Sequence, residues 1–247
     1  MSNTENYTKL FVGGDLSGIQ KFLYNITSKK AAVSLKGRSV YLREYMEKKC
    51  RELTELPIVA ETKPEVIYCS GGKFYIIMQN TCEVQDALKQ YARKIKVEIW
   101  KEHKGQLSIN LSWVPFSENS DGSINANGET KQKLGYLWQC ITEDFARQKN
   151  QKFLEEIKEN YEDFFEVIEV GGKPKVCAVT GIESDNLVEF KYRYRKDEEE
   201  VPPIYVLRSV AEQIKKGEEL RDIERTHSFE EYAEDTYLGI LRMMWTD

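Results

Sequence analysis

Lys9-Leu10-Phe11-Val12-Gly13-Gly14-Asp15-Leu16-Ser17-Gly18 is the stretch that decides the fold. Residues 9–15 are apolar and β-prone and run into two glycines, which is typical of a short buried strand that ends at the Asp15 carboxylate. Over residues 19–26, apolar side chains then recur with the i, i+3, i+4, i+7 spacing of one helix face. Ser17 is a natural N-cap for this helix. The stretch therefore predicts a buried strand followed directly by a helix.

The next hundred residues complete a small α+β domain. They predict a polar basic loop at 28–37, a helix at 40–53, strands at 65–69 and 74–78, a helix at 84–100 and a strand at 106–113. Ser70-Gly71-Gly72-Lys73 joins the middle two strands as a hairpin, with glycines that supply positive φ angles. This order matches the βαββαβ pattern of a ferredoxin-like, palm-type domain over residues 1–116, with an additional helix in the first crossover.

Residues 117–236 predict a second, mostly helical and mixed linker domain. Its segments are a polar loop at 117–128, a long amphipathic helix or a broken pair at 134–161, short strands and exposed loops at 176–206, and a helix at 209–219. A further strand is expected at 237–242, close to the last residue of the sequence. A strand in that position lacks a following partner, which is unusual for a self-contained domain.

The amino-acid composition argues against several classes of protein. Apolar residues at 40%, aromatic residues at 11% and a mean hydropathy of −0.58 together argue against wholesale disorder and membrane spanning. The chain has 36 Lys and Arg against 41 Asp and Glu, a net charge of −5. The net charge also argues against nucleic-acid binding through bulk electrostatics. The N-terminus has no secretory pattern, and the five cysteines are odd in number and scattered, so reduced thiols and a cytoplasmic location are expected.

Asp15 and the glycine hairpin suggest phosphate chemistry. Palm-type nucleotidyl cyclases and polymerases place one carboxylate at the end of the first strand and another in a Gly-Gly hairpin, where they bind two divalent cations. Here the acidic position of the hairpin is occupied by Lys73, which cannot ligate magnesium but can neutralise a phosphate. The segment 15–18 is either a phosphate or ribose contact at a helix N-terminus or an ordinary cap and turn.

Four segments resemble one known family, the large polymerase-like subunit of type III CRISPR effector complexes. They are Gly14-Asp15-Leu16-Ser17-Gly18-Ile19-Gln20-Lys21-Phe22, Ser34-Leu35-Lys36-Gly37-Arg38-Ser39 with Tyr41-Leu42, Tyr68-Cys69-Ser70-Gly71-Gly72-Lys73-Phe74, and Tyr237-Leu238-Gly239-Ile240-Leu241-Arg242-Met243. The resemblance covers residues ~9 to 115 well and the rest more loosely. It implies that residues 1–116 are the degenerate first palm and that residues 237–247 are the start of a truncated second palm.

In that family the first palm helps to form a composite ATP site with the second palm, and the intact subunit makes cyclic oligoadenylate when target RNA is bound. The resemblance implies that ATP, with Mg²⁺, binds a face formed by Asp15, Ser17, Gly18, Gln20, Gly71, Gly72 and Lys73. It assigns Arg38 and Ser39 either to structure or to RNA or phosphate contact. The implied partners are other subunits of a type III CRISPR ribonucleoprotein, its guide RNA and a chain that supplies a second palm, with no membrane contact.

Departures from the family limit the expected activity. Neither His103 nor His227 is followed by Asp, so an HD nuclease site is not expected. Thr180 stands where a second cysteine would pair with Cys177, so no structural zinc is expected. Because the Gly-Gly-Asp-Asp hairpin is absent, the chain is expected to bind nucleotide and partners without catalysing alone. Two alternatives stay open: a free-standing or homodimeric nucleotidyl cyclase acting on ATP, and a decayed product with only interaction capacity.

Overall fold

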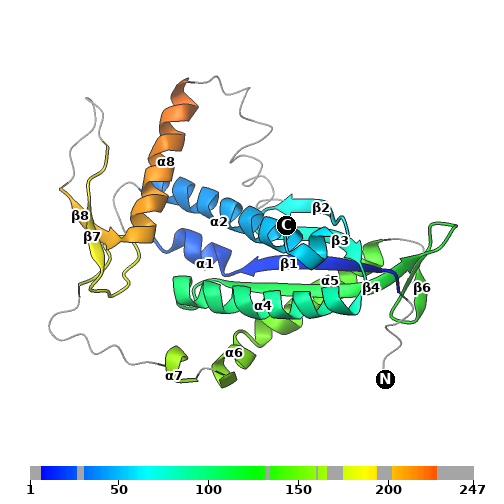
Figure 1. The fold of residues 1–247 in the computed structure, drawn as a ribbon. Coiled ribbons are helices and arrows are strands. Elements are labelled where there is room, and N and C mark those ends of the chain that lie inside the picture. The colour runs from blue at the N-terminus through cyan, green and yellow to red at the C-terminus, as the bar shows by residue number, and fades with distance from the viewer. Residues whose placement is uncertain are drawn as a thin grey trace. The chain divides into compact units, whose positions relative to one another are not determined.

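The structure is a computed structural model that describes residues 7–26, 31–131, 134–159, 161–165, 175–193 and 202–226 (Figure 1). The chain divides into two compact units. The first unit contains residues 1–19 and 45–165, and the second contains residues 20–44 and 166–247.

The first unit is built on a mixed set of strands and helices. Its strands are β1 (Lys9–Ser17), β2 (Glu65–Ser70), β3 (Lys73–Gln79), β4 (Ser108–Glu118), β5 (Ile124–Ala126) and β6 (Glu129–Lys131). Its helices are α3 (Pro57–Ala60), α4 (Cys82–His103), α5 (Gly135–Asn150), α6 (Leu154–Glu159) and α7 (Tyr161–Phe164), together with the last part of α2 (Ala31–Thr54).

The second unit holds most of α1 (Ile19–Tyr24), the first part of α2, β7 (Leu187–Phe190), β8 (Ile204–Leu207) and α8 (Arg208–Thr226). Its two strands pair antiparallel, and α8 packs against both of them. None of the described helices in either unit is both long and apolar enough to cross a bilayer.

The sheet of the first unit is antiparallel throughout, in the order β2-β3-β1-β4-β5-β6. β1 is central because it pairs with β3 on one side and with β4 on the other. Gly71 and Gly72 form the turn between β2 and β3 with φ angles of 57° and 82°, which confirms the predicted glycine hairpin. In this register Asp15 lies directly opposite Lys73 on β3.

Alternate side chains of β1 point to opposite faces of the sheet, and both faces are buried. On one face, Phe11 packs with Tyr75 of β3 and with Leu137, Ile141 and Phe145 of α5. The opposite face carries Leu10 and Val12, and α4 runs alongside β4 (Figure 1). The result is a strand with no solvated face, which explains the continuous apolar run of residues 10–12.

Several predicted boundaries differ from the structure. β1 continues past Asp15 to Ser17, and α2 begins at Ala31, so a helix replaces part of the loop expected at 28–37. The loop expected at 117–128 contains the end of β4 and all of β5, and the sheet continues to Lys131, beyond the domain boundary expected at residue 116.

The amphipathic segment at 134–161 is broken into α5 and α6, which bears out the broken-pair alternative. The strand expected at 237–242 lies outside the described residues.

The crossing of α2 and α8 organises the second unit, and it depends on two glycines. A Cβ on Gly37 would overlap the carbonyl oxygen of Gln213, and a Cβ on Gly217 would overlap the carbonyl oxygen of Val33. Gly37 and Gly217 therefore let two helix backbones approach more closely than any side chain permits. This packing requirement explains two mid-helix glycines that helix propensity alone disfavours.

Arg38 anchors the end of α1 within the second unit. Its Nη1 donates hydrogen bonds to the carbonyl oxygens of Phe22 at 2.6 Å and Asn25 at 2.9 Å, and its guanidinium lies 5.0 Å from the Phe22 ring centroid. Only 2% of Arg38 is exposed, and burial lowers its pKa. Ser39, also buried, donates to the Leu35 carbonyl at 3.0 Å. These contacts support the structural alternative for both residues rather than a contact with RNA or phosphate.

Replacement of Gly217 by alanine is expected to lower the free energy of unfolding by about 1–3 kcal/mol, because the added methyl group overlaps a helix backbone that cannot move aside cheaply. Gly135→Ala is the matched control, because Gly135 begins α5 and a Cβ there meets nothing within 4 Å. Urea unfolding of the two variants measures the difference. Equal stability of the two variants would contradict the close crossing.

Arg38→Gln is expected to lower the free energy of unfolding by about 2–3 kcal/mol, because it leaves the buried carbonyl oxygen of Phe22 and the partly buried one of Asn25 without their donor. The control is Lys48→Gln, which removes only an exposed ion pair with Glu52 at 3.8 Å on the same helix. Thermal and urea unfolding provide the readout. If the Arg38→Gln protein kept its stability but bound RNA more weakly, the result would contradict the structural role and favour an RNA contact for Arg38.

Candidate functional site

A polar cluster lies where β1, β4 and α5 meet in the first unit. The Asp15 carboxylate is 3% exposed, and its Oδ2 lies 2.9 Å from Lys149 Nζ on α5. The Ser17 hydroxyl donates to the same Oδ2 at 3.1 Å, and Asn110 Nδ2 donates to Ser17 Oγ at 3.1 Å. Because Asp15 and Ser17 are two residues apart on β1, both face α5. The cluster is therefore a continuous chain from Asn110 through Ser17 and Asp15 to Lys149.

The strand β4 contributes more polar groups to this face. Ser108, Asn110 and Ser112 alternate along β4 and are all buried, on the same side as Asp15 by the β1–β4 register. Both faces of β4 are covered at residues 108–112. The polar side chains serve as hydrogen-bonding groups inside the molecule, not as a solvated surface.

The glycine hairpin is fixed against the end of β1. The Leu16 N–H donates to the Gly72 carbonyl at 2.8 Å, and a Cβ on Gly72 would overlap the Ile19 side chain. Gly18 has a φ of 92° and lies against the Gln106 carbonyl, so a Cβ there also has no room. The hairpin turn and the 15–18 segment are thus held together by backbone contacts that require glycine.

Lys73 is a positively charged residue on β3, the strand next to Asp15. It is exposed and lies opposite Asp15 in the β1–β3 register. Tyr75, two residues along β3, shares the face that packs against α5 and stacks on Phe11 at 5.6 Å between ring centroids. Burial, assisted by the negative charge of Asp15, raises the pKa of Tyr75, so its phenol stays protonated at neutral pH.

The structure brings together most of the residues that the sequence nominated. Asp15, Ser17, Gly18, Gly71, Gly72 and Lys73 all lie at one end of β1 and the β2–β3 hairpin. Gln20 is exposed and is the first residue of the second unit.

Two contributors were missed by sequence reasoning. They are Asn110 and Lys149. Lys149 did carry a signal, because it follows the buried Ile141 and Phe145 at four-residue intervals and so falls on the apolar face of α5.

A divalent cation does not fit this cluster as it stands. Among the residues that the structure describes, no group of three or more His, Cys, Asp or Glu side chains is placed to hold a metal ion. Asp15 is the one nominated carboxylate, and it already contacts Lys149 and Ser17.

The histidines and Cys177 provide no metal site in the described part of the chain either. His103 is buried on α4, where burial lowers its pKa, and His227 lies outside the described residues. Cys177 is buried in the second unit as a free thiol. The expectation that no structural zinc binds stays a prediction.

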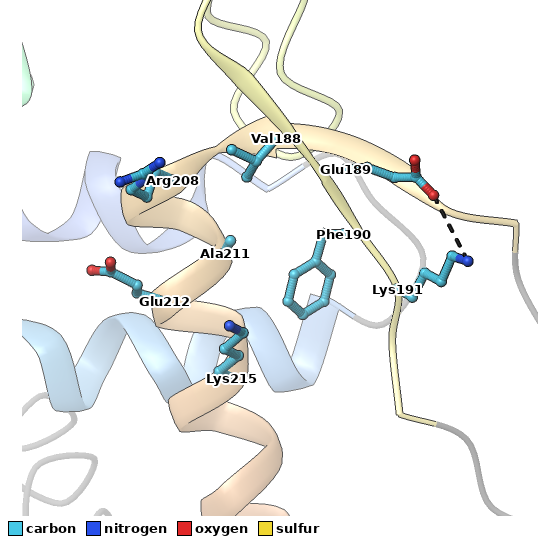
Figure 2. Close-up of a pocket in the computed structure, with 8 residues that line it drawn as sticks. All are labelled: Val188, Glu189, Phe190, Lys191, Arg208, Ala211, Glu212 and Lys215. Carbon is cyan, nitrogen blue, oxygen red and sulfur yellow. Dashed lines mark ion pairs between the residues drawn. The ribbon is translucent and has the colours of Figure 1, made fainter.

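The second unit contains a separate groove of about 490 Å³ between β7 and α8 (Figure 2). Val188, Phe190 and Ala211 supply its apolar surface, and Phe190 points toward α8. Its charged groups are Glu189, Lys191, Arg208, Glu212 and Lys215. Glu189 and Lys191 form an ion pair at 3.9 Å, whereas Arg208 and Lys215 have no ion pair with another described residue.

Comparisons with known proteins agree with this fold. The family described as Csm1 subunit domain B matches residues 8–169. Among curated proteins, the CRISPR system single-strand-specific deoxyribonuclease Cas10/Csm1 (subtype III-A) of Enterococcus italicus is 31% identical over 150 residues, covering 60% of this chain and 19% of that protein. The protein of the same name from Methanocaldococcus jannaschii is 32% identical over 149 residues, covering 58% and 18%.

Solved structures show the same architecture. A crystal structure of a Csm1–Csm4 cassette in complex with pppApA has a TM-score of 0.52 at 21% identity, covering 83% of this chain and 26% of that chain. A Csm1–Csm4 cassette in complex with cA4 gives a TM-score of 0.51 at 18% identity, covering 84% and 26%. The chain spans about a fifth of the length of the curated relatives that it matches. Because the domain match covers well over half of its residues, the chain belongs to the Csm1 family of type III CRISPR large subunits and carries their domain B.

Proposed function

We propose that this chain acts in antiviral defence as the degenerate first palm of a type III CRISPR large subunit, and that it binds ATP at the Asp15 cluster. The observation that carries the proposal is the chain of polar groups from Asn110 to Lys149, placed beside Lys73 and the Gly71-Gly72 turn. The two cations are suited to phosphate groups, and the Ser17 hydroxyl is suited to a further phosphate or ribose oxygen.

The strand order supports the ferredoxin-like palm assignment. A βαββαβ unit places its fourth, first, third and second strands side by side, and β4, β1, β3 and β2 follow that order here. Helices fill both crossovers, with α1 to α3 between β1 and β2 and α4 between β3 and β4. Adenine-containing ligands in the similar Csm1–Csm4 cassettes, such as pppApA and AMPPNP, support nucleotide as the ligand class.

This unit is not expected to catalyse a reaction alone. In a catalytic palm the hairpin supplies a metal-binding carboxylate, and Lys73 occupies that position with the opposite charge. The alternative of a free-standing or homodimeric cyclase acting on ATP needs a carboxylate that replaces the missing one. Within the described residues no acidic cluster near Asp15 provides it.

ATP is expected to bind the full chain, and Lys73→Ala is expected to weaken binding about tenfold, the effect of losing one charge-assisted phosphate contact. Lys89→Ala is the control, because Lys89 is exposed on α4 and pairs only with Asp86 at 2.9 Å. Isothermal titration gives the affinities, and chromatography of the same samples tests for product. Any cyclic or linear oligoadenylate would point to the homodimeric cyclase instead.

Partner subunits are the second part of the proposal. Other subunits of a type III CRISPR ribonucleoprotein, its guide RNA and a chain with a second palm remain the proposed partners, in a cytoplasmic complex. A protein contact is proposed for the groove between β7 and α8, because the apolar Val188, Phe190 and Ala211 lie among its charged groups. β7 pairs only with β8 among the described strands, which leaves its other edge open to an extended segment.

An acidic extended segment of a Csm4-type subunit is the proposed occupant, because Arg208 and Lys215 lack partners in the described structure. The double change Arg208→Glu and Lys215→Glu is expected to weaken binding of that subunit at least tenfold. The matched control reverses two exposed lysines of α4, Lys89 and Lys94. Biolayer interferometry measures the affinity of each double variant for that subunit. Equal affinities of the two double variants would place the contact elsewhere, and competition by single-stranded RNA would assign the groove to nucleic acid.

A further inference from the structure

The Asp15 carboxylate is arranged as a support for a lysine rather than as a metal ligand. It is almost fully buried, whereas 46% of the Lys149 side chain is exposed. The Lys149 ammonium therefore lies between the carboxylate and solvent, 2.9 Å from Oδ2, and the Ser17 hydroxyl donates to the same oxygen. A ligand that approaches this end of β1 meets the ammonium group first.

The surrounding charges also oppose a divalent cation. Lys149 pairs with Asp15 at 2.9 Å, and the exposed Lys73 is the cross-strand neighbour of Asp15 on β3. Asp144, five residues before Lys149 on α5, accepts hydrogen bonds from Arg147 at 2.7 Å and from Gln148 at 2.7 Å. Mg²⁺ is bound in proteins through one or two carboxylates and several waters in octahedral geometry. Here the single nominated carboxylate is already neutralised by an ammonium group.

We propose that Lys149 takes the place of the divalent cation at this site: the triphosphate of the nucleotide contacts Lys149 and Lys73 directly, and binding to this chain does not require Mg²⁺. Asp15 is then a positioning residue that holds the Lys149 ammonium, and Asn110 and Ser17 hold Asp15. This inference rests on the proposed nucleotide site. It adds that the ligand is a nucleoside triphosphate without a bound metal, and that Lys149 is its main phosphate-binding group.

The two roles of Asp15 predict different responses to substitution. If Asp15 ligates Mg²⁺, Asp15→Asn removes the gain in affinity that Mg²⁺ provides and has little effect without the metal. If Asp15 holds Lys149, Asp15→Asn weakens binding equally with and without Mg²⁺, and less than Lys149→Gln does, because the cation itself remains. The size of the effect in EDTA therefore separates the two roles.

The experiment is a titration of the full chain with ATP, in excess EDTA and in excess Mg²⁺, for the wild type, Lys149→Gln and Asp15→Asn. Lys9→Gln is the matched control, because Lys9 also pairs with a carboxylate, Glu118 at 2.6 Å, at the other end of β1. Six residues of strand separate Lys9 from Asp15, or about 20 Å. We expect wild-type affinities within threefold of each other in the two buffers, and at least a tenfold loss in Lys149→Gln in both.

Removal of Lys149 alone leaves a buried carboxylate without its partner, which can impair folding. The double variant Asp15→Asn with Lys149→Gln removes both charges, and circular dichroism checks that each protein is folded. A folded double variant that binds ATP as tightly as the wild type would overturn the role of Lys149. Binding seen only with Mg²⁺ and lost in Asp15→Asn would overturn the metal-free site while leaving the nucleotide site in place. Absence of ATP binding in both buffers would overturn the proposed nucleotide site itself.

Discussion

The ion pair between Asp15 and Lys149 connects the centre of the sheet to the helix that covers it. A carboxylate this deeply buried is costly unless it is paired and hydrogen-bonded, so α5 must end with its lysine over β1. One turn earlier, Phe145 packs into the aromatic cluster around Phe11. Helix α5 thus packs apolar side chains on one part of this sheet face and pairs with Asp15 on the other. Both contacts together set the position of α5 along the sheet. A shift by one residue would break both contacts.

Glycines on β1 make that close approach possible. A Cβ on Gly13 would lie 2.7 Å from the Ile141 side chain and 3.0 Å from Phe145, and a Cβ on Gly14 would overlap the ring of Phe74. Two glycines beside a carboxylate would leave the backbone open to close approach if nothing else packed there. In the structure, side chains of α5 and β3 fill that space. Ser17, Lys73 and Lys149 lie at the edge of this packed region and are the groups that we propose to meet the nucleotide.

The sequence was sufficient for features with a local cause. The glycine hairpin follows from two residues that accept positive φ, and α4 follows from a regular apolar period. The N-cap of α4, Thr81, was found only in the structure. Features that depend on tertiary contacts were not predictable in the same way. Asn110 is indistinguishable by pattern from a solvated strand residue until α5 covers it. Arg38 lies in a basic segment that suggests phosphate contact, yet it binds the carbonyl oxygens of α1 because α2 starts seven residues before it.

Lys73 and Lys149 together change what this face can do chemically. A two-metal palm gathers carboxylates so that cations bridge the triphosphate and the attacking hydroxyl. This face has the same strand order and the same glycine hairpin, but lysines provide its positive charge. An ammonium group can neutralise phosphate but cannot activate a hydroxyl as a bound metal does. The lysines at this face therefore supply positive charge without the metal-binding carboxylates that a two-metal site requires.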